Sequence, residues 1–256
     1  MKILEDIIAD LEKGVKITEI RRGLLWIGVV SRHCGLASTL YQGGCGSAGW
    51  ISDNSPDHLN MVADELAALS FSQDIPEASL GMAAINSLIE FDQDECEELN
   101  ASDFLLKAGH GKNVSIIGHF PFVDKVKEVA NNLWVIEKRP QPGDLEEEKS
   151  STYLPRSDVI AISSTTFINH TLPSILKLCP AGSVKIMLGP STPMSKILFD
   201  YGIDIISGCY VTDTALVLEN ISRGISFSAM KRSGGIRLLN LFKDKEKYKR
   251  IMSSSH

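Results

Sequence analysis

The sequence lacks long apolar runs and has no excess of basic residues. No apolar stretch reaches the ~18 residues that a membrane span needs. Acidic side chains at Glu5, Asp6 and Asp10 occupy the place where a signal peptide would need an apolar segment. The net charge of −6 argues against a nucleic-acid backbone or an anionic membrane as the main partner. We therefore expect a cytoplasmic protein with a small-molecule ligand, and leave open whether it forms a homo-oligomer.

The sequence also lacks paired cysteines. Its five cysteines are odd in number, widely spaced and without a CxxC motif: Cys34, Cys45, Cys96, Cys179 and Cys209. A soft-metal site at His33, Cys34 and Cys45 would need four ligands with suitable spacing, so these cysteines are better explained as small apolar groups in the core. We expect no intrinsic metal site, and any metal should arrive inside a chelating ligand.

The first part of the chain has strands followed by helices, the order typical of an α+β domain. We expect this domain over residues 1–110. Its predicted elements are a helix at 3–11, strands at 15–20, 24–31 and 36–41, a glycine-rich loop at 43–49, and helices at 59–69 and 77–91. The acidic residues 92–98 indicate either a polar connection between the two halves or, more simply, a solvated helix end.

After Lys112 short apolar strands alternate with helices. This alternation predicts a parallel sheet buried on both faces. We expect a Rossmann-like α/β domain over residues 111–256 with strand order 3-2-1-4-5. Its five predicted strands lie at 114–117, 133–136, 159–162, 184–188 and 203–206, with helices near 123–130, 166–178, 195–201 and 213–222.

Ligands of such sheets bind beyond the carboxyl ends of the strands, where the strand order reverses. In the predicted order this switch point lies between the first and fourth strands. The loops there are expected to hold the ligand through Gly118, His119, Phe120 and Pro121, and through Gly189, Pro190, Ser191 and Thr192. The dinucleotide motif GxGxxG is absent. The cofactor is therefore unknown, with a nucleoside-containing one left open.

Polar residues follow the second and third strands. Glu137 stands nineteen residues after Gly118, where an acid can accept from a ribose diol, although Lys138 and Arg139 could simply pair with it. Thr165, Thr166 and Asn169 could line a pocket, or cap a helix. His119 is a candidate general acid or base beside Glu137, although it could merely border the loop.

Several segments together resemble an uncharacterised bacterial and archaeal family labelled "putative heavy-metal chelation". They are residues 81–88 (GMAAINSL), 117–121 (IGHFP), 135–137 (VIE), 157–166 (SDVIAISSTT) and 188–193 (LGPSTP). The resemblance implies an enolase N-terminal-like domain followed by a Rossmann-like domain, with the site in the crevice between them. It also implies that Asn86 reaches this crevice from the first domain; a bond to nearby backbone is the alternative.

Two classes of function remain open. The resemblance favours an enzyme acting on a pterin-, flavin- or siderophore-like metabolite linked to heavy-metal handling. The alternatives are a non-catalytic carrier or sensor of a metal-chelate complex, and a methyltransferase using S-adenosylmethionine. A single glycine where several are usual argues against the methyltransferase.

Overall fold

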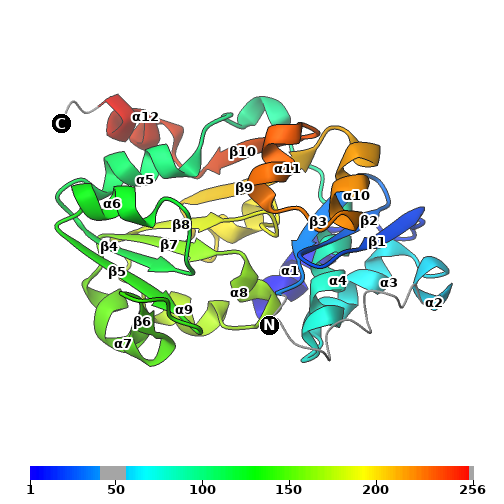
Figure 1. The fold of residues 1–256 in the computed structure, drawn as a ribbon, viewed down its shortest axis with the longest axis horizontal. Helices are drawn as coiled ribbons and strands as arrows, with labels where there is room; N and C mark the ends of the chain where they lie inside the picture. The colour runs from blue at the N-terminus through cyan, green and yellow to red at the C-terminus, as the bar shows by residue number, and fades with distance from the viewer. Residues whose placement is uncertain (41–55, 254–256) are drawn as a thin grey trace.

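The computed structural model, which describes residues 1–40 and 56–253, contains two separate β-sheets (Figure 1). The small sheet is antiparallel, in the order β1 (Glu19–Arg22), β2 (Trp26–Val30), β3 (Cys34–Ser38). The large sheet has seven strands, of which only the last pairs antiparallel. This confirms the predicted combination of an α/β and an α+β part. The predicted loop at residues 43–49 lies outside the described residues.

One face of the small sheet packs on helix α4 (Ile75–Leu88). Asp74 caps this helix by accepting from the amide of Glu77, and Pro76 stands in its first turn, which explains why it begins there. The contact is close because Gly35 of β3 has no side chain. A Cβ atom at this position would lie 2.1 Å from the carbonyl oxygen of Ala83. The other N-terminal helices are α1 (Lys2–Asp10), α2 (Pro56–Leu59), α3 (Ala63–Ala67) and the 3-10 helix η2 (Ala68–Phe71).

The opposite face of the small sheet is covered by the C-terminal part of the chain, which the sequence did not predict. Helix α10 (Thr214–Ser222) contacts β1 and β2, and its Leu218 and Ile221 join a buried cluster with Leu36 of β3. Trp26 donates from its indole nitrogen to the carbonyl of Ile225, over 3.1 Å. The small sheet therefore lies between helices from the two ends of the chain.

The large sheet has the order β6-β5-β4-β7-β8-β9-β10. The first five strands in chain order thus occupy the predicted arrangement 3-2-1-4-5. However, the third place belongs to the two-residue strand β6. Residues 159–162, which the sequence analysis had taken as the third strand, form β7 and pair with β4. The switch point consequently lies between β4 and β7. The strands are β4 (Asn113–Ile117), β5 (Asn132–Glu137), β6 (Leu145–Glu146), β7 (Val159–Ser163), β8 (Val184–Leu188), β9 (Ile205–Val211) and β10 (Ile236–Phe242).

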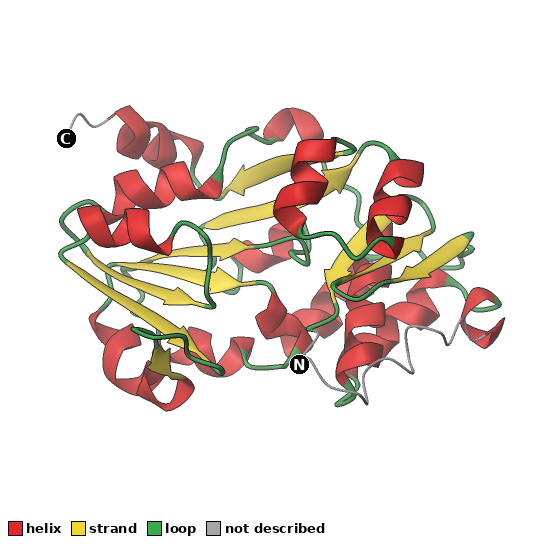
Figure 2. Cartoon of the chain, in the orientation of Figure 1, coloured by secondary structure: helices red, strands yellow, loops and turns green. Residues whose placement is uncertain are grey.

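Helices cover both faces of the large sheet, as Figure 2 shows. The predicted helix at 166–178 is interrupted, because His170 has a positive φ of 58°. The predicted helix near 195–201 is a single 3-10 turn. The elements are α6 (Val123–Val129), η4 (Glu147–Lys149), α7 (Ser150–Tyr153), η5 (Leu154–Arg156), α8 (Thr165–Ile168), α9 (Leu172–Leu178), η6 (Lys196–Phe199), α11 (Phe227–Ser233) and α12 (Lys245–Ser253).

The connection between the sheets is partly ordered. It contains the 3-10 helix η3 (Gln93–Glu95) and the helix α5 (Ala101–Gly109), which the sequence analysis had left without a helix. Phe104 and Leu105 of α5 are buried with Val114 of β4, so this helix packs on the large sheet. A second buried cluster contains residues of both parts, such as Ala83 of α4 and Phe167 of α8. The domain division at residue 110 stays a prediction.

Candidate functional site

The carboxyl ends of the parallel strands point toward the side of the molecule that holds the small sheet (Figure 1). Two cavities lie along this edge. The first, which we call the switch-point pocket, lies at the ends of β4, β5 and β7 and has a volume of about 50 Å³. Its polar lining consists of Glu137, Lys138, Glu147, Ser150, Ser163, Thr165, Thr166, Asn169 and Thr171, with Gly118 beside them.

The hydroxyl and amide groups of the switch-point pocket bond mainly to one another or to nearby backbone. The hydroxyls of Ser163 and Thr165 are 2.8 Å apart, and Thr166 donates to the carbonyl of Ser163 at 2.7 Å. Asn169 accepts from the hydroxyl of Thr171 at 2.7 Å. These bonds are the local capping and turn contacts that such residues make at strand-to-helix junctions. The groups therefore already have partners within the protein.

The glycines of the two predicted ligand loops both have positive φ angles, 103° at Gly118 and 126° at Gly189. Their neighbours are protein atoms. A Cβ at Gly118 would lie 3.0 Å from the Cβ of Ser163, and one at Gly189 would lie 2.6 Å from the hydroxyl oxygen of Ser164. Turn conformation and packing against the β7 loop thus account for both glycines. The two loops are not adjacent, because β7 lies between β4 and β8.

The carboxylate of Glu137 accepts from two backbone amides, His119 at 2.8 Å and Lys138 at 3.0 Å. It thereby ties the loop after β4 to the end of β5. The Lys138 side chain instead pairs with Glu147, at 3.6 Å. The imidazole of His119 contacts the carboxylate of Asp144, with Nδ1–Oδ2 and Nδ1–Oδ1 distances of 2.9 and 3.2 Å. Sequence reasoning missed Asp144, which precedes β6 in the loop after β5.

The second cavity, the inter-sheet pocket, lies between β3 and α4 on one side and the ends of β8 and β9 on the other. Its volume is about 20 Å³, enough for about one water molecule. The lining residues are His33, Cys34, Gly35, Leu36, Asn86, Ile89, Phe91, Pro190, Thr192, Met194, Cys209, Tyr210 and Val211. They include no Asp, Glu, Lys or Arg.

Two polar atoms that belong to residues lining the inter-sheet pocket are buried without a hydrogen-bond partner among the described residues. They are Oδ1 of Asn86 and Oγ1 of Thr192. The orientation of the Asn86 amide is fixed, since its Nδ2 donates to the carbonyl of Leu36 at 2.8 Å. This bond is the backbone contact that the sequence analysis offered as the alternative, but it uses only half of the amide. An unpaired buried polar atom typically costs ~1–3 kcal/mol, so a partner at this position would be favourable.

The inter-sheet pocket is electrically neutral near pH 7. Burial raises the pKa of the Cys34 thiol to about 12 and that of Cys209 to about 12, so both stay protonated. Burial also lowers the pKa of His33, whose ring packs edge-on against Tyr210 with centroids 5.9 Å apart. Phe91 meets Tyr210 in the same way at 6.0 Å. The pocket thus combines an aromatic wall with two unpaired polar atoms.

The structure places eight of the thirteen predicted site residues in these two cavities. Gly118, Glu137, Thr165, Thr166 and Asn169 line the switch-point pocket, and Asn86, Pro190 and Thr192 line the inter-sheet pocket. Ser191 accepts from the amide of Ser38 at 2.8 Å and so joins the loop after β8 to β3. Phe120 stacks on Phe122, and Pro121 is exposed. His119, although adjacent to Gly118, lines neither cavity.

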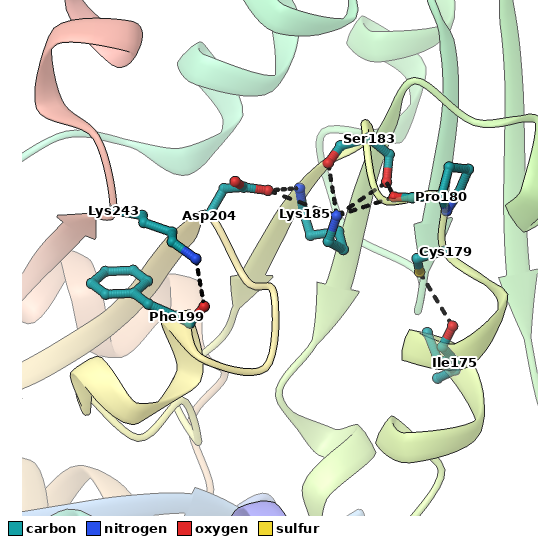
Figure 3. Close-up of polar contacts among 8 residues, drawn as sticks. All are labelled: Ile175, Cys179, Pro180, Ser183, Lys185, Phe199, Asp204 and Lys243. Carbon is teal, nitrogen blue, oxygen red and sulfur yellow. Dashed lines mark hydrogen bonds and ion pairs between the residues drawn. The ribbon is translucent and has the colours of Figure 1, made fainter.

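At the amino ends of the strands of the large sheet lies an open hollow of about 660 Å³, which is larger than either cavity. Ligands of parallel sheets bind at the carboxyl ends of the strands, so this hollow is a poorer candidate for the ligand site than the two cavities. Beside it the buried Lys185 donates to the carbonyls of Ser183 at 2.8 Å and Pro180 at 3.2 Å (Figure 3). Its Nζ lies 4.0 Å from Asp204. These carbonyls belong to the turn between α9 and β8, so we interpret Lys185 as a structural residue that holds this turn.

No helix in the described part of the chain is long and apolar enough to cross a membrane. Within residues 1–40 and 56–253, no three His, Cys, Asp or Glu side chains cluster in a way that could hold a metal ion. Cys45, which the sequence analysis considered with His33 and Cys34, lies outside these ranges.

These features define a mixed α/β protein with a large, mostly parallel sheet facing a small antiparallel one. The chain belongs to the family described as "putative heavy-metal chelation". One family model, DUF364, matches residues 100–240, and a second with the same description, DUF4213, matches residues 4–89. This confirms the resemblance drawn from the sequence motifs.

Solved structures and one curated relative are similar to this chain. A DUF364-family protein of unknown function from Desulfitobacterium hafniense has a TM-score of 0.80 and 21% identity, covering 94% of this chain and 98% of that one. One from Pyrococcus horikoshii has a TM-score of 0.78 and 20% identity, with the same coverage. These show the shared fold. An uncharacterized protein of Methanocaldococcus jannaschii is 28% identical over 163 residues, which make up 61% of this chain and 63% of that relative.

Proposed function

We propose that this protein binds a small, uncharged metabolite in the inter-sheet pocket. The observation that carries the proposal is the pair of unpaired buried atoms, Asn86 Oδ1 and Thr192 Oγ1, in residues that line one cavity. They come from different parts of the chain, α4 and the loop after β8. A ligand that donates an N–H or O–H to Asn86 and exchanges a hydrogen bond with the Thr192 hydroxyl would satisfy both.

The neutral lining argues for a ligand whose buried part carries no net charge. An ionised group there would lose its hydration without gaining a counter-charge. The rings of His33, Phe91 and Tyr210 favour a planar partner, since aromatic faces and edges pack well on one another. A pterin-, flavin- or siderophore-like chelating heterocycle has this character, and the family's description supports a link to heavy-metal handling.

The cavity, at about 20 Å³, is much smaller than the ~300–1,000 Å³ of typical ligand pockets. We infer that only the polar edge of the metabolite enters it, or that the walls separate on binding. Met194 and Leu36 are the lining side chains that could move most easily, because thioether and aliphatic groups hold no hydrogen bonds. A carrier or sensor fits this pocket as well as an enzyme does, since binding alone uses both unpaired atoms.

The proposal is tested by incubating the purified protein with a desalted metabolite extract and identifying what co-elutes by native mass spectrometry. We expect one compound to be retained by wild type and lost in Asn86→Leu and Thr192→Val. The matched control is Thr166→Val, which changes an equally buried threonine of the switch-point pocket. Elemental analysis of the same samples shows whether the compound carries a metal. Equal retention by all three variants would place the site elsewhere.

A further inference from the structure

We propose that His119 is an acid–base residue at the rim of the switch-point pocket, with Asp144 and Glu137 as its positioning residues. The proposal goes beyond the binding function inferred for the inter-sheet pocket and involves none of its residues. It rests on the contact of one imidazole with one buried carboxylate, and on the place of that contact in the fold.

The hydrogen bond to Asp144 decides which imidazole nitrogen carries the proton. An ionised carboxylate only accepts hydrogen bonds, so Nδ1 of His119 must be the donor across the 2.9 Å contact. In the neutral imidazole Nε2 then has a free lone pair. Among the described residues Nε2 has no hydrogen-bond partner, and the side chain is 31% exposed. A basic nitrogen is therefore presented to solvent or to an arriving ligand.

Both positioning residues are themselves held in place. The side chain of Asp144 is only 3% exposed, and its Oδ2 also accepts from the amide of Gln141 at 3.0 Å. The turn between them contains Gly143, whose φ of 100° requires a glycine-like conformation. On the other side, Glu137 holds the backbone amide of His119 at 2.8 Å. The histidine is thus fixed through its ring and through its main chain.

The His119–Asp144 pair lies beside a cavity that could receive a reacting group. Gly118, directly before His119, and Glu137, bonded to its amide, both line the switch-point pocket. A substrate held in this cavity that extends an acidic O–H or N–H past its rim to the exposed imidazole would give its proton to Nε2. The new N–H bond forms on the imidazole, the electron pair of the broken bond stays on the substrate oxygen or nitrogen, and Asp144 stabilises the resulting imidazolium. The proton can then leave to solvent, because the ring is partly exposed.

In a purely structural interpretation, the contact of His119 with Asp144 only holds the loop after β5 against the loop after β4. The two readings differ in what they require of Nε2. A structural contact of this kind needs only the Nδ1 hydrogen bond, and the reactivity of Nε2 is then that of any exposed histidine. An acid–base residue needs the Nδ1–H tautomer and an Nε2 that the carboxylate makes more nucleophilic.

Two measurements test the proposal: both readings require the Nδ1–H tautomer, and the reactivity of Nε2 separates them. Long-range ¹H–¹⁵N NMR, with the resonance assigned by its loss in His119→Gln, reports the tautomer at a pH where the ring is neutral. Reaction with diethyl pyrocarbonate, followed by peptide mapping, reports the nucleophilicity of each histidine. We expect the Nδ1–H tautomer in wild type, and a rate of His119 modification that falls by roughly threefold or more in Asp144→Asn, since a charge-assisted hydrogen bond is about twice as strong as a neutral one.

Asp124→Asn is the matched control, because this exposed acid belongs to α6 in the same part of the fold. It should leave the rate unchanged, and Asp144→Glu should restore part of it. If Asp144→Asn does not fold, an Nε2–H tautomer in the wild-type protein would still overturn the proposal. An Nε2–H tautomer, or equal modification rates in wild type and Asp144→Asn, would overturn the proposal. Neither result bears on the proposal that the inter-sheet pocket binds a metabolite.

Discussion

The switch-point pocket and the inter-sheet pocket lie on the same side of the large sheet and each has a buried threonine in its lining, yet the hydrogen bonding of the two threonines differs. In the first, Thr166 donates to the carbonyl of Ser163, and Ser163 meets Thr165. In the second, Thr192 Oγ1 and Asn86 Oδ1 have no partner among the described residues. Both threonines are 2% exposed, so the difference does not arise from burial.

This contrast distinguishes buried polar groups whose hydrogen bonds stabilise the fold from buried polar groups that a ligand could still bond. A buried hydroxyl with a bond contributes to stability, whereas one without a bond costs free energy until something satisfies it. By this criterion the hydroxyls after β7, for which the sequence leaves a pocket or a helix cap open, make local capping and turn contacts while they line the switch-point pocket. The positions that a ligand would stabilise lie instead where the two sheets meet.

The largest effect should come from removing a fully bonded buried group. Lys185→Met leaves the carbonyl of the buried Ser183 without a donor among the described residues, whereas the carbonyl of Pro180 keeps the amide and the hydroxyl of Ser183. We expect the free energy of unfolding to fall by up to roughly 3 kcal/mol, since one buried unpaired acceptor costs about 1–3 kcal/mol. Metabolite retention, measured as for the inter-sheet pocket, should not change, because Lys185 lies at the far edge of the sheet. Denaturant-induced unfolding gives the energy.

Lys243→Met is the control for this variant, since Lys243 also donates to a carbonyl, that of Phe199 at 2.8 Å, but is exposed (Figure 3). Water can replace the lost partner there, and we expect a change below about 0.5 kcal/mol. Equal losses in the two variants would mean that burial does not set the cost of an unpaired group here. The comparison of the two pockets would then lose its basis.

A smaller effect should follow from the thiols, which only the inter-sheet pocket contains. Burial raises the pKa of Cys34 to about 12, above the ordinary value of 9.0. The folded protein therefore holds this proton more tightly than the unfolded chain. The stabilisation is complete below pH 9 and is lost as the pH rises toward 12. Between pH 9 and pH 10.5 the loss should reach about 2 kcal/mol for this one thiol.

Thermal unfolding of wild type and Cys34→Ala across this range tests the effect. The variant should be less stable at pH 8, because it leaves a small gap in the core. The difference in melting temperature should then shrink as the pH rises, since lysines and tyrosines titrate alike in both proteins. A difference that stays constant from pH 8 to pH 10.5 would show that Cys34 ionises normally, and that the pocket is wetter than its lining indicates.

Much of the fold could be predicted from local patterns. Periodicity, which depends only on neighbouring residues, predicts the apolar strands of the large sheet, such as residues 114–117, and the amphipathic first helix. The strand order could be predicted in outline, but not the identity of the third strand. Leu145–Glu146 is too short to show any period. The packing of α10 on the small sheet depends on a long-range chain path that no local pattern encodes.

The candidate site was predictable only in part, for a related reason. A sequence shows that Thr166 and Thr192 each stand in a loop after a strand, and both were expected to reach a ligand. It does not show that Thr166 bonds to a carbonyl three residues back, while Thr192 lines a cavity together with Asn86 of α4. Hydrogen-bond satisfaction is a property of the folded arrangement. Asp144 was missed for the same reason, since its contact with His119 spans 25 residues.

The smallest effect, and the sharpest test of the comparison, is the same substitution at the two threonines. Thr166→Val removes a donor from the bond to Ser163 and should destabilise the ligand-free protein by about 1 kcal/mol. Thr192→Val removes an oxygen that has no partner within the described residues and should stabilise it by about 1 kcal/mol. Both side chains are equally buried and the added methyl group is the same, so packing costs largely cancel. The measurement is denaturant-induced unfolding of protein freed of ligand by refolding. Two losses of similar size would mean that the Thr192 hydroxyl bonds to an enclosed water; the unpaired atoms would then be evidence of hydration, and the case for a ligand between the sheets would fail.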